Sequence, residues 1–204
     1  HIHFKNSMEI TKIEDTDHED FNESWEIYEY SFPTDERRGI EKQKEVLNQE
    51  EDSFSSINDE DTVTGMIATW DFDTISFIEH IAIKKECRGK GIGTKIMKEH
   101  CEKNNKKVIL EVERPEDDIS KKRIEFYKKL GFTLNEFDYL QPAYEEGKKP
   151  VPLFIMSFPE ELSFEEYQGI KRNLYEKVYK VKGENANIKI ILINPEGKIL
   201  LLHL

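Results

Sequence analysis

The most constraining feature of this sequence is a strand-like run that ends in a basic, glycine-rich turn and leads into a helix. Residues 75–84 have the alternation of a strand, and the chain then reads Lys85-Glu86-Cys87-Arg88-Gly89-Lys90-Gly91-Ile92-Gly93. Glycines remove the side chains that would block a phosphate, and a helix N-terminus offers unpaired N–H groups and positive dipole charge. The pattern therefore predicts an anion-binding loop.

Several phosphate loops share these features, and a glycine-rich turn without any ligand is also open. The Walker loop is excluded because no Gly-Lys-Ser/Thr follows a four-residue gap. The dinucleotide fingerprint needs a third glycine where Thr94 stands, although Glu111 or Glu113 would supply its acidic partner. The dinucleotide reading therefore remains a weaker alternative.

The order of elements predicts an α+β chain with a mixed, mostly antiparallel sheet and helices on both faces. Strands are expected at 8–14, 53–57, 62–71, 75–84, 107–113, 132–139 and 151–157. Helices are expected at 18–30, 36–50, from Gly93 onward, at 118–130 and at 163–179. The helix at 118–130 is expected to point Ile119, Phe126, Tyr127 and Leu130 inward.

Two motifs at a matching separation resemble the GNAT superfamily of acyl-CoA-dependent N-acetyltransferases. Arg88, Gly91 and Gly93 fit its Arg/Gln-x-x-Gly-x-Gly/Ala pyrophosphate loop, and residues 126–132 (FYKKLGF) are similar to its Phe-Tyr-x-x-Leu-Gly-Phe segment. The resemblance spans about Met8 to Phe158. It implies a sheet whose fourth and fifth strands splay apart, with the pantetheine arm of acetyl-CoA in the gap.

The resemblance also implies a set of cofactor-binding residues. The main-chain N–H groups near two strand residues would bind the thioester carbonyl, and the loop would bind the pyrophosphate. A family asparagine seven residues before the tyrosine is replaced here by a serine, whose hydroxyl can still form a hydrogen bond. The expected residues are Ile81, Ile83, Arg88, Gly89, Lys90, Gly91, Gly93, Thr94 and Ser120.

Glu79 is the candidate general base, because an attacking amine has to lose a proton. Strand alternation places it with Phe77, Ile81 and Ile83, and apolar company would raise its pKa toward neutrality. A structural carboxylate at a strand end is an equal alternative, and Glu111 or an ordered water would be a substitute base. His80 is expected on the opposite face as a packed side chain.

Tyr127 resembles the family tyrosine that meets the CoA sulfur, which implies that it protonates the leaving thiolate. Its alternative role is a core aromatic. The resemblance places the acceptor pocket near residues 32–38 and 139–144.

The composition limits the kinds of molecule that this protein is expected to bind. A formal net charge of -12 works against nucleic-acid binding, and no apolar run is long enough to span a bilayer. Two cysteines fit a reduced cytoplasmic chain, and neither they nor the six histidines have metal-ligand spacing. We therefore expect a cytoplasmic protein without a metal, without a membrane anchor, and with an amine-bearing small molecule or peptide as partner; a homodimer is left open.

The expected organisation is a remnant at 1–7, an acetyltransferase domain at 8–182 and a hairpin of unknown role at 183–204, turning at 194–197. The expected function is transfer of an acetyl group from acetyl-CoA to a primary amine. A noncatalytic acyl-CoA-binding module on the same fold is the alternative from another class.

Overall fold

The computed structural model describes residues 8–181, 189–193, 195 and 199–203. The chain forms two compact units that divide after Leu162. The domain boundaries expected from the sequence, including the remnant at 1–7, stay predictions.

The first unit is built on a seven-stranded sheet in the order β1-β2-β3-β4-β5-β7-β6. Neighbouring strands are antiparallel except β4 and β5, which are parallel. The mixed, mostly antiparallel sheet expected from the sequence is thus confirmed. The strands are β1 (Met8–Lys12), β2 (Asp52–Asp59), β3 (Thr62–Asp71), β4 (Ile75–Ile83), β5 (Lys107–Glu113), β6 (Thr133–Gln141) and β7 (Val151–Phe158).

Four α-helices and two short 3-10 turns connect the strands of this unit within the described residues. They are α1 (Phe21–Ser31), η1 (Thr34–Glu36), α2 (Ile40–Val46), η2 (Lys85–Cys87), α3 (Ile92–Lys103) and α4 (Asp118–Lys129). The helix expected at 36–50 is wrong in extent, because the backbone is extended at Arg37 and Gly39 and separates η1 from α2.

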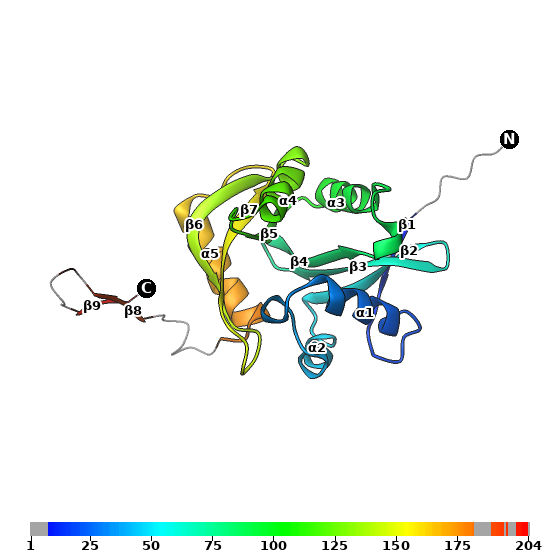
Figure 1. The fold of residues 1–204 in the computed structure, drawn as a ribbon, viewed down its shortest axis with the longest axis horizontal. Coiled ribbons are helices and arrows are strands. Elements are labelled where there is room, and N and C mark those ends of the chain that lie inside the picture. The colour runs from blue at the N-terminus through cyan, green and yellow to red at the C-terminus, as the bar shows by residue number, and fades with distance from the viewer. Residues whose placement is uncertain (1–7, 182–188, 194, 196–198, 204) are drawn as a thin grey trace. The chain divides into compact units, whose positions relative to one another are not determined.

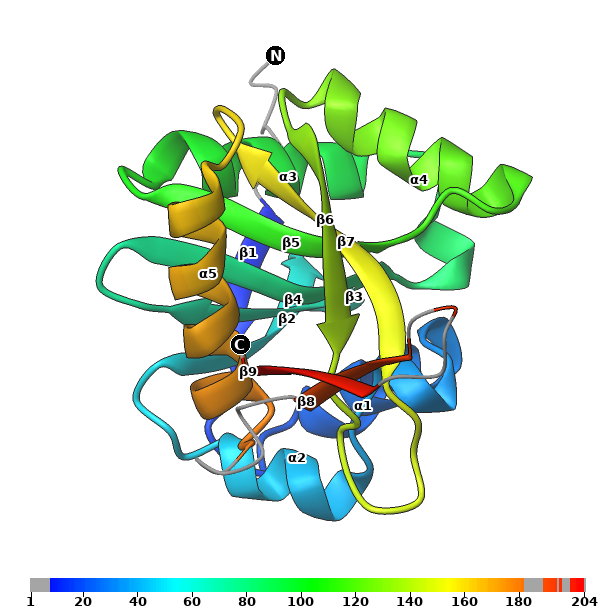
Figure 2. The ribbon, with the colours of Figure 1, turned by 90° about the vertical axis from the view of Figure 1, so that its left-hand side faces the viewer.

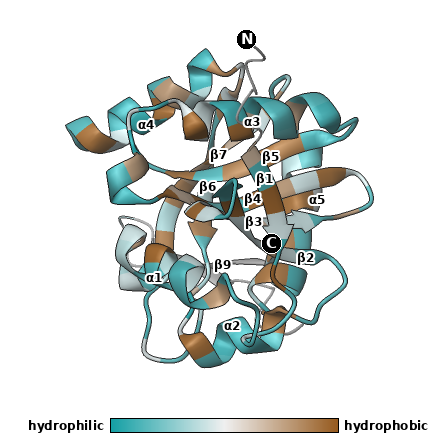
Figure 3. Cartoon of the chain, turned by 90° about the vertical axis from the view of Figure 1, so that its right-hand side faces the viewer, coloured by the Kyte–Doolittle hydropathy of each residue, from teal (hydrophilic) through white to brown (hydrophobic). Residues whose placement is uncertain are grey.

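Helices cover both faces of the sheet, as Figure 1 and Figure 2 show, with α1 and α2 on one side and α3 and α4 on the other. Each face has its own apolar cluster. Phe21, Trp25 and Tyr28 of α1 pack on Phe54 and Met66 of the sheet. The opposite cluster includes Ile92, Ile96, Met97, Ile78, Leu110 and Ile124. Helices therefore carry both hydrophobic and hydrophilic stretches in Figure 3, whereas β4 and β5 are largely hydrophobic.

The inward face of α4 differs from the sequence expectation. Ile119 and Phe126 are exposed, and the buried residues are Ser120 and Ile124. Ser120, Ile124 and Tyr127 lie four and three positions apart, which places them on one face of a helix. Tyr127 and Leu130 pack against the core, as expected.

A β-bulge in β4 sets the orientation of the residues that line the site. His80 pairs with Ala68 of β3 while Ile78 pairs with Thr69, so Glu79 is the extra residue. Ile78 and Ile81 consequently contact the same apolar cluster although they are three residues apart. The strict alternation that grouped Glu79 with Ile81 and Ile83 is therefore wrong.

The second unit starts with α5 (Phe164–Asn173), which is followed by a π-helical turn, η3 (Leu174–Val178). The side chains of Ser163 and Glu166 form a capping box at its N-terminus. Strands β8 (Lys189–Ile193) and β9 (Ile199–His203) pair antiparallel, as the predicted hairpin requires. Of the turn predicted at 194–197, all but residue 195 lies outside the described residues.

Among the described residues, no helix combines the length and the apolar character that crossing a bilayer requires.

Gly65 of β3 provides a test of the packing between β3 and β4. A Cβ atom at Gly65 would lie 2.6 Å from the main-chain oxygen of Ala82, and a backbone atom cannot move aside cheaply. We expect Gly65→Ala to lower the free energy of unfolding by about 1–3 kcal/mol or more, as overpacking does. Thermal and denaturant unfolding measure this loss.

Gly169→Ala is the matched control, because nothing lies within 4 Å of its Cβ position in α5. Alanine favours a helix over glycine by about 1 kcal/mol, so this variant should keep or raise the melting temperature. Equal melting temperatures for the two variants would contradict the close approach of β3 and β4.

Candidate functional site

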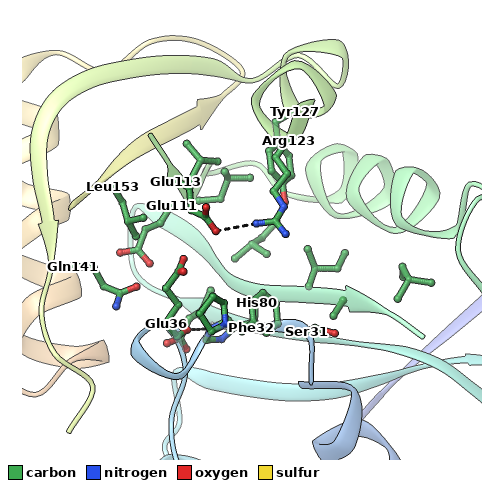
Figure 4. A pocket seen from close by; sticks show the side chains of 18 of the residues that line it. Ser31, Phe32, Glu36, His80, Glu111, Glu113, Arg123, Tyr127, Gln141 and Leu153 are labelled. Carbon is green, nitrogen blue, oxygen red and sulfur yellow. Dashed lines mark hydrogen bonds and ion pairs between the residues drawn. The ribbon is translucent and has the colours of Figure 1, made fainter. Parts of the chain in front are cut away.

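A cavity of about 430 Å³ opens where β4 and β5 part. The two strands pair only from Ile75–Lys107 to Ile78–Leu110; beyond this, β4 stays on β3 and β5 stays on β7. The edge of β4 that faces β5 therefore has no strand partner from Glu79 onward. Figure 4 shows the side chains around this space. Its walls come from the end of α1, from η1, β4, β5 and α4, and from the strands and connection of β6–β7.

A second hollow of about 300 Å³ lies on the glycine-rich loop. Gly89 and Gly91 have left-handed backbones, with φ of 79° and 78°, and nothing lies within 4 Å of their Cβ positions. Gly91 caps α3, and its carbonyl accepts the first helical hydrogen bond, from the Lys95 amide. The amides of residues 92–94 thus face outward without helical partners, which is the arrangement that binds anions.

The two hollows adjoin, because Ile83 and Arg88 line both of them. Arg88 is fixed by a 2.9 Å hydrogen bond from its Nε to the Ile83 carbonyl, which holds its positive charge at the junction. The molecule thus offers one path from an anion-binding loop into the gap between the parted strands. Such a path suits a long ligand with a phosphate group at one end.

Seven of the nine cofactor-binding residues expected from the sequence line this path. They are Ile81, Ile83, Arg88, Gly89, Gly91, Gly93 and Thr94. Lys90 is exposed on the loop and lines neither hollow.

Ser120 also lies outside both hollows, and its hydroxyl belongs to the cap of α4. It donates to Asp117 Oδ1 at 2.8 Å and accepts the Asp117 amide at 3.2 Å, which completes a capping box. The side chain is buried on the inner face of the helix. The structure therefore gives Ser120 a capping role, and the cofactor contact expected from its place before the tyrosine stays a prediction.

Glu79 is held by three partners, and its side chain is completely buried. Arg38 Nη1 lies 2.9 Å from Oε1, Trp70 Nε1 donates to Oε1 at 2.8 Å, and the Tyr144 hydroxyl donates to Oε2 at 2.6 Å. Arg38 itself lies over the Tyr144 ring, with 4.9 Å between Cζ and the ring centroid.

This environment overturns the expected raised pKa of Glu79. Burial is the largest single influence and raises the pKa of Glu79, but the charge of Arg38 and the hydrogen bonds from Arg38 and Tyr144 together outweigh it and lower the pKa to about 2. A carboxylate with so little affinity for a proton is a poor base at neutral pH. The sequence near Glu79 predicts apolar neighbours, because Arg38 lies 41 positions away and meets Glu79 only in the folded chain.

His80 is a packed side chain, as expected. Its ring meets Tyr28, Phe32 and Tyr144 edge-on or tilted. Nε2 lies 2.8 Å from the Glu36 carbonyl, which can only accept, so Nε2 carries the hydrogen. Burial lowers the pKa of His80, which keeps the ring neutral.

Glu36 is a cavity carboxylate that sequence analysis left unassigned within segment 32–38. No hydrogen bond or ion pair to its carboxylate occurs among the described residues, and the side chain lines the cavity. Burial, then the charges of Glu113 and Asp35, raise the pKa of Glu36 to about 7, although Arg123 acts against this. No local sequence signal could have identified it, because Glu113 and Arg123 come from other elements.

Tyr127 projects from α4 into the same cavity, as Figure 4 shows. Burial raises the pKa of its hydroxyl, so the group keeps its proton at neutral pH. Glu111 lines the opposite part of the wall and accepts a 2.6 Å hydrogen bond from the Tyr139 hydroxyl. The cavity thus brings the neutral Tyr127 hydroxyl together with several carboxylates.

Within the described part of the chain, no group of three or more His, Cys, Asp or Glu side chains is arranged to hold a metal ion.

Comparison with known proteins gives a consistent set of matches. Residues 50–134 match the model of the acetyltransferase (GNAT) domain. A Bacteroides thetaiotaomicron structure described as a GNAT-family acetyltransferase is 34% identical, with a TM-score of 0.79, covering 85% of this chain and 99% of that one.

Two further relatives are more distant. Bacillus subtilis YjbC, described as an acetyltransferase, is 25% identical over 75% of this chain and 79% of its own length. An Elizabethkingia anophelis GNAT-family acetyltransferase solved with acetyl-CoA is 15% identical, with a TM-score of 0.52, over 75% of this chain and 98% of that one. At 15% identity, the match to the E. anophelis structure shows a shared fold and nothing more.

Glu79→Gln tests the buried ion pair. Glutamine keeps the shape and leaves the Arg38 charge without a counter-charge, so we expect a loss of about 3–5 kcal/mol in the free energy of unfolding. Glu113→Gln is the matched control, because Glu113 pairs with Arg123 in a partly exposed position and should cost about 0–1 kcal/mol.

The same pair predicts the acid limb of stability. Because the folded pKa of Glu79 is depressed from 4.5 to about 2, its contribution is present above about pH 4.5 and is lost as the pH falls toward 2. Unfolding free energies measured across this range should therefore fall less steeply in Glu79→Gln. An unchanged slope would show that Glu79 is not ionised in the folded protein.

Proposed function

Because this chain belongs to the GNAT superfamily and is an N-acyltransferase, we propose that it moves an acetyl group from acetyl-CoA to a primary amine of a small molecule or peptide. The observation that carries the proposal is the path from the α3 N-terminus into the gap between β4 and β5. Family membership argues against the dinucleotide-binding alternative, and the transfer assay below tests the noncatalytic one.

Acetyl-CoA fits the two parts of this path by chemistry. We propose that the pyrophosphate lies on the amides of Gly91, Gly93 and Thr94, with Arg88 beside it. The pantetheine arm then occupies the unpaired edge of β4, where main-chain N–H groups near Ile81 and Ile83 bind the thioester carbonyl and stabilise its developing negative charge. Acetyl-CoA in the distant E. anophelis relative is consistent with this assignment.

Tyr127 is the proposed proton donor for the departing thiolate. It lines the cavity, and no other described residue bonds to its hydroxyl. The raised pKa of this hydroxyl keeps the proton available until a thiolate forms nearby.

The acceptor is proposed to enter from the side of η1 and the β6–β7 connection. Glu36, Gln141 and Tyr144 line this end, and they come from the two segments that the sequence singled out. A cytoplasmic location also stays a proposal; it is in keeping with Cys87 and Cys101, which are both free.

Thermal shift and a transfer assay test the function together. CoA and acetyl-CoA should raise the melting temperature, because a ligand that binds only the native state stabilises it, whereas NAD should not. The transfer assay detects free thiol with acetyl-CoA and 1,4-diaminobutane, spermidine, L-lysine, hydroxylamine or a peptide with a free amino terminus. No stabilisation by CoA, or no thiol release with any amine, would overturn the proposal.

Gly91→Glu should abolish acetyl-CoA binding while the fold survives. The new carboxylate would stand at the cap of α3, where it fills the phosphate position with like charge. Calorimetry of acetyl-CoA binding measures the effect.

Gly147→Glu is the matched control, because Gly147 also has a positive φ, of 88°, and open space around its Cβ position. Both variants carry the same backbone strain and the same charge. A Gly91→Glu protein that binds acetyl-CoA as tightly as the control would contradict the loop assignment.

Tyr127→Phe should lower kcat by about 10²–10⁴-fold, the range of a lost general acid, and hardly change acetyl-CoA affinity. Tyr30→Phe removes a hydroxyl from the same cavity wall, where it only accepts the Lys85 amide, and should have a small effect. Single-turnover rates are the measurement, since they isolate the chemical step. Similar rates in the two variants would show that Tyr127 packs against the core and does not act as the acid.

A further inference from the structure

We propose that Glu36 is the general base of this site and that the acceptor is an alkylamine that arrives as its ammonium cation. The inference rests on the proposed acetyl transfer. Glu36 takes the place of Glu79 as the candidate base, because the Glu79 carboxylate already accepts hydrogen bonds from Arg38, Trp70 and Tyr144.

The first support is the position of Glu36 at the acceptor end of the cavity. Figure 4 shows Glu36 on one side of the space and Glu111, Glu113 and Tyr127 on the other. Glu36 belongs to η1 and Tyr127 to α4, so a group between them can meet a base and an acid from different elements. This separation is what a reaction with one proton acceptor and one proton donor requires.

The second support is that the main chain beneath Glu36 is fixed from two strands. His80 of β4 donates to the Glu36 carbonyl at 2.8 Å, and Gln141 of β6 donates to the Asp35 carbonyl at 3.0 Å. The Lys149 amide donates to Asp35 Oδ1 at 3.0 Å. A carboxylate that is itself unpaired among the described residues, on a backbone tied to the sheet, is preorganised to accept a proton.

The third support is the charge around the carboxylate. Glu113 of β5 and Asp35 of η1 repel it, Arg123 of α4 attracts it, and His80 of β4 is neutral. Burial and repulsion outweigh Arg123 and raise the pKa of Glu36 to about 7. A base with a pKa near the working pH combines availability with proton affinity.

The same carboxylates indicate the state in which the acceptor arrives. An alkylamine has a pKa near about 10 and is an ammonium ion at neutral pH. Glu36 at the acceptor end and Glu111 and Glu113 across the cavity favour the binding of such a cation, and the net charge of -12 favours its approach. Because an ammonium ion has no lone pair with which to attack a carbonyl, it has to be deprotonated first, and we assign this step to Glu36.

Atoms and protons are conserved in the proposed acetyl transfer. Glu36 takes one proton from the ammonium and later releases it to solvent. The neutral nitrogen attacks the thioester carbonyl, the C–N bond forms and the C–S bond breaks. Tyr127 gives its proton to the thiolate and regains one from the acylated nitrogen, which leaves the amide and free CoA.

Glu36→Gln should lower kcat/KM for the fastest alkylamine of the transfer panel by about 10²–10⁴-fold at pH 7, while acetyl-CoA affinity stays unchanged. The limb of the wild-type pH profile near pH 7 should disappear. With hydroxylamine, which is neutral at pH 7 and needs no initial deprotonation, the loss should be at least tenfold smaller.

Asp35→Asn is the matched control, because it removes the same charge one residue away from a side chain that does not line the cavity. It should keep most of the rate and keep the limb, moved to lower pH because the charge of Asp35 no longer raises the pKa of Glu36. Equal losses in Asp35→Asn and Glu36→Gln, or equal losses with both kinds of amine, would overturn the base role.

A titration of ¹³C-labelled glutamate carboxyls, with the Glu36 signal assigned by its absence in Glu36→Gln, is independent of turnover. A signal that titrates near pH 7 supports the inference, and one that titrates near pH 4 overturns it. A wild-type protein that binds acetyl-CoA and acetylates no amine would instead overturn the proposed function, and the base role with it.

Discussion

The buried ion pair between Arg38 and Glu79 is the interaction on which the rest of the site depends. It joins the connection between α1 and α2 to the bulge of β4, and hydrogen bonds from Trp70 and Tyr144 add β3 and the β6–β7 connection. Removing two charges from water is costly, and only full pairing and additional hydrogen bonds offset that cost. The network thereby ties Arg38 and Tyr144, from residues 32–38 and 139–144, to the same carboxylate on β4.

The network also distributes proton affinity among nearby carboxylates. Glu79 is next to a guanidinium and has a pKa of about 2, whereas Asp52 and Glu36 lack such a close partner and have pKa values raised to about 7 by burial. The charge of Glu79 adds to the effect of burial at Asp52, and Glu113 does the same at Glu36. Identical functional groups thus acquire different chemistry from their surroundings.

The parting of β4 and β5 makes room for the ligand and depends on the backbone. After four paired positions the two strands follow different neighbours, and the bulge at Glu79 falls where the pairing ends. A bulge bends a strand and reorients its side chains. The unpaired edge, the buried carboxylate and part of the cavity wall thus all lie at one irregularity in β4.

The sequence by itself determined the features that rest on local backbone chemistry. The glycine-rich loop at 85–93, the helix that follows and the mixed sheet could all be predicted, because glycine conformations and residue periodicity act over a few positions. The seven loop and strand residues that line the two hollows were instead expected from the resemblance to the GNAT motifs, and their binding role stays a proposal. Tyr127 was identified with its flanking motif.

Only the tertiary structure decided which charged groups meet. Arg38 reaches Glu79 across 41 positions and Tyr144 reaches it across 65, so no local pattern could show that Glu79 is neutralised or that Glu36 is left unpaired. One inserted residue in β4 also overturned the alternation used to orient Glu79. The physical reason is that proton affinity is set by distant charges and burial, which exist only once the chain has packed.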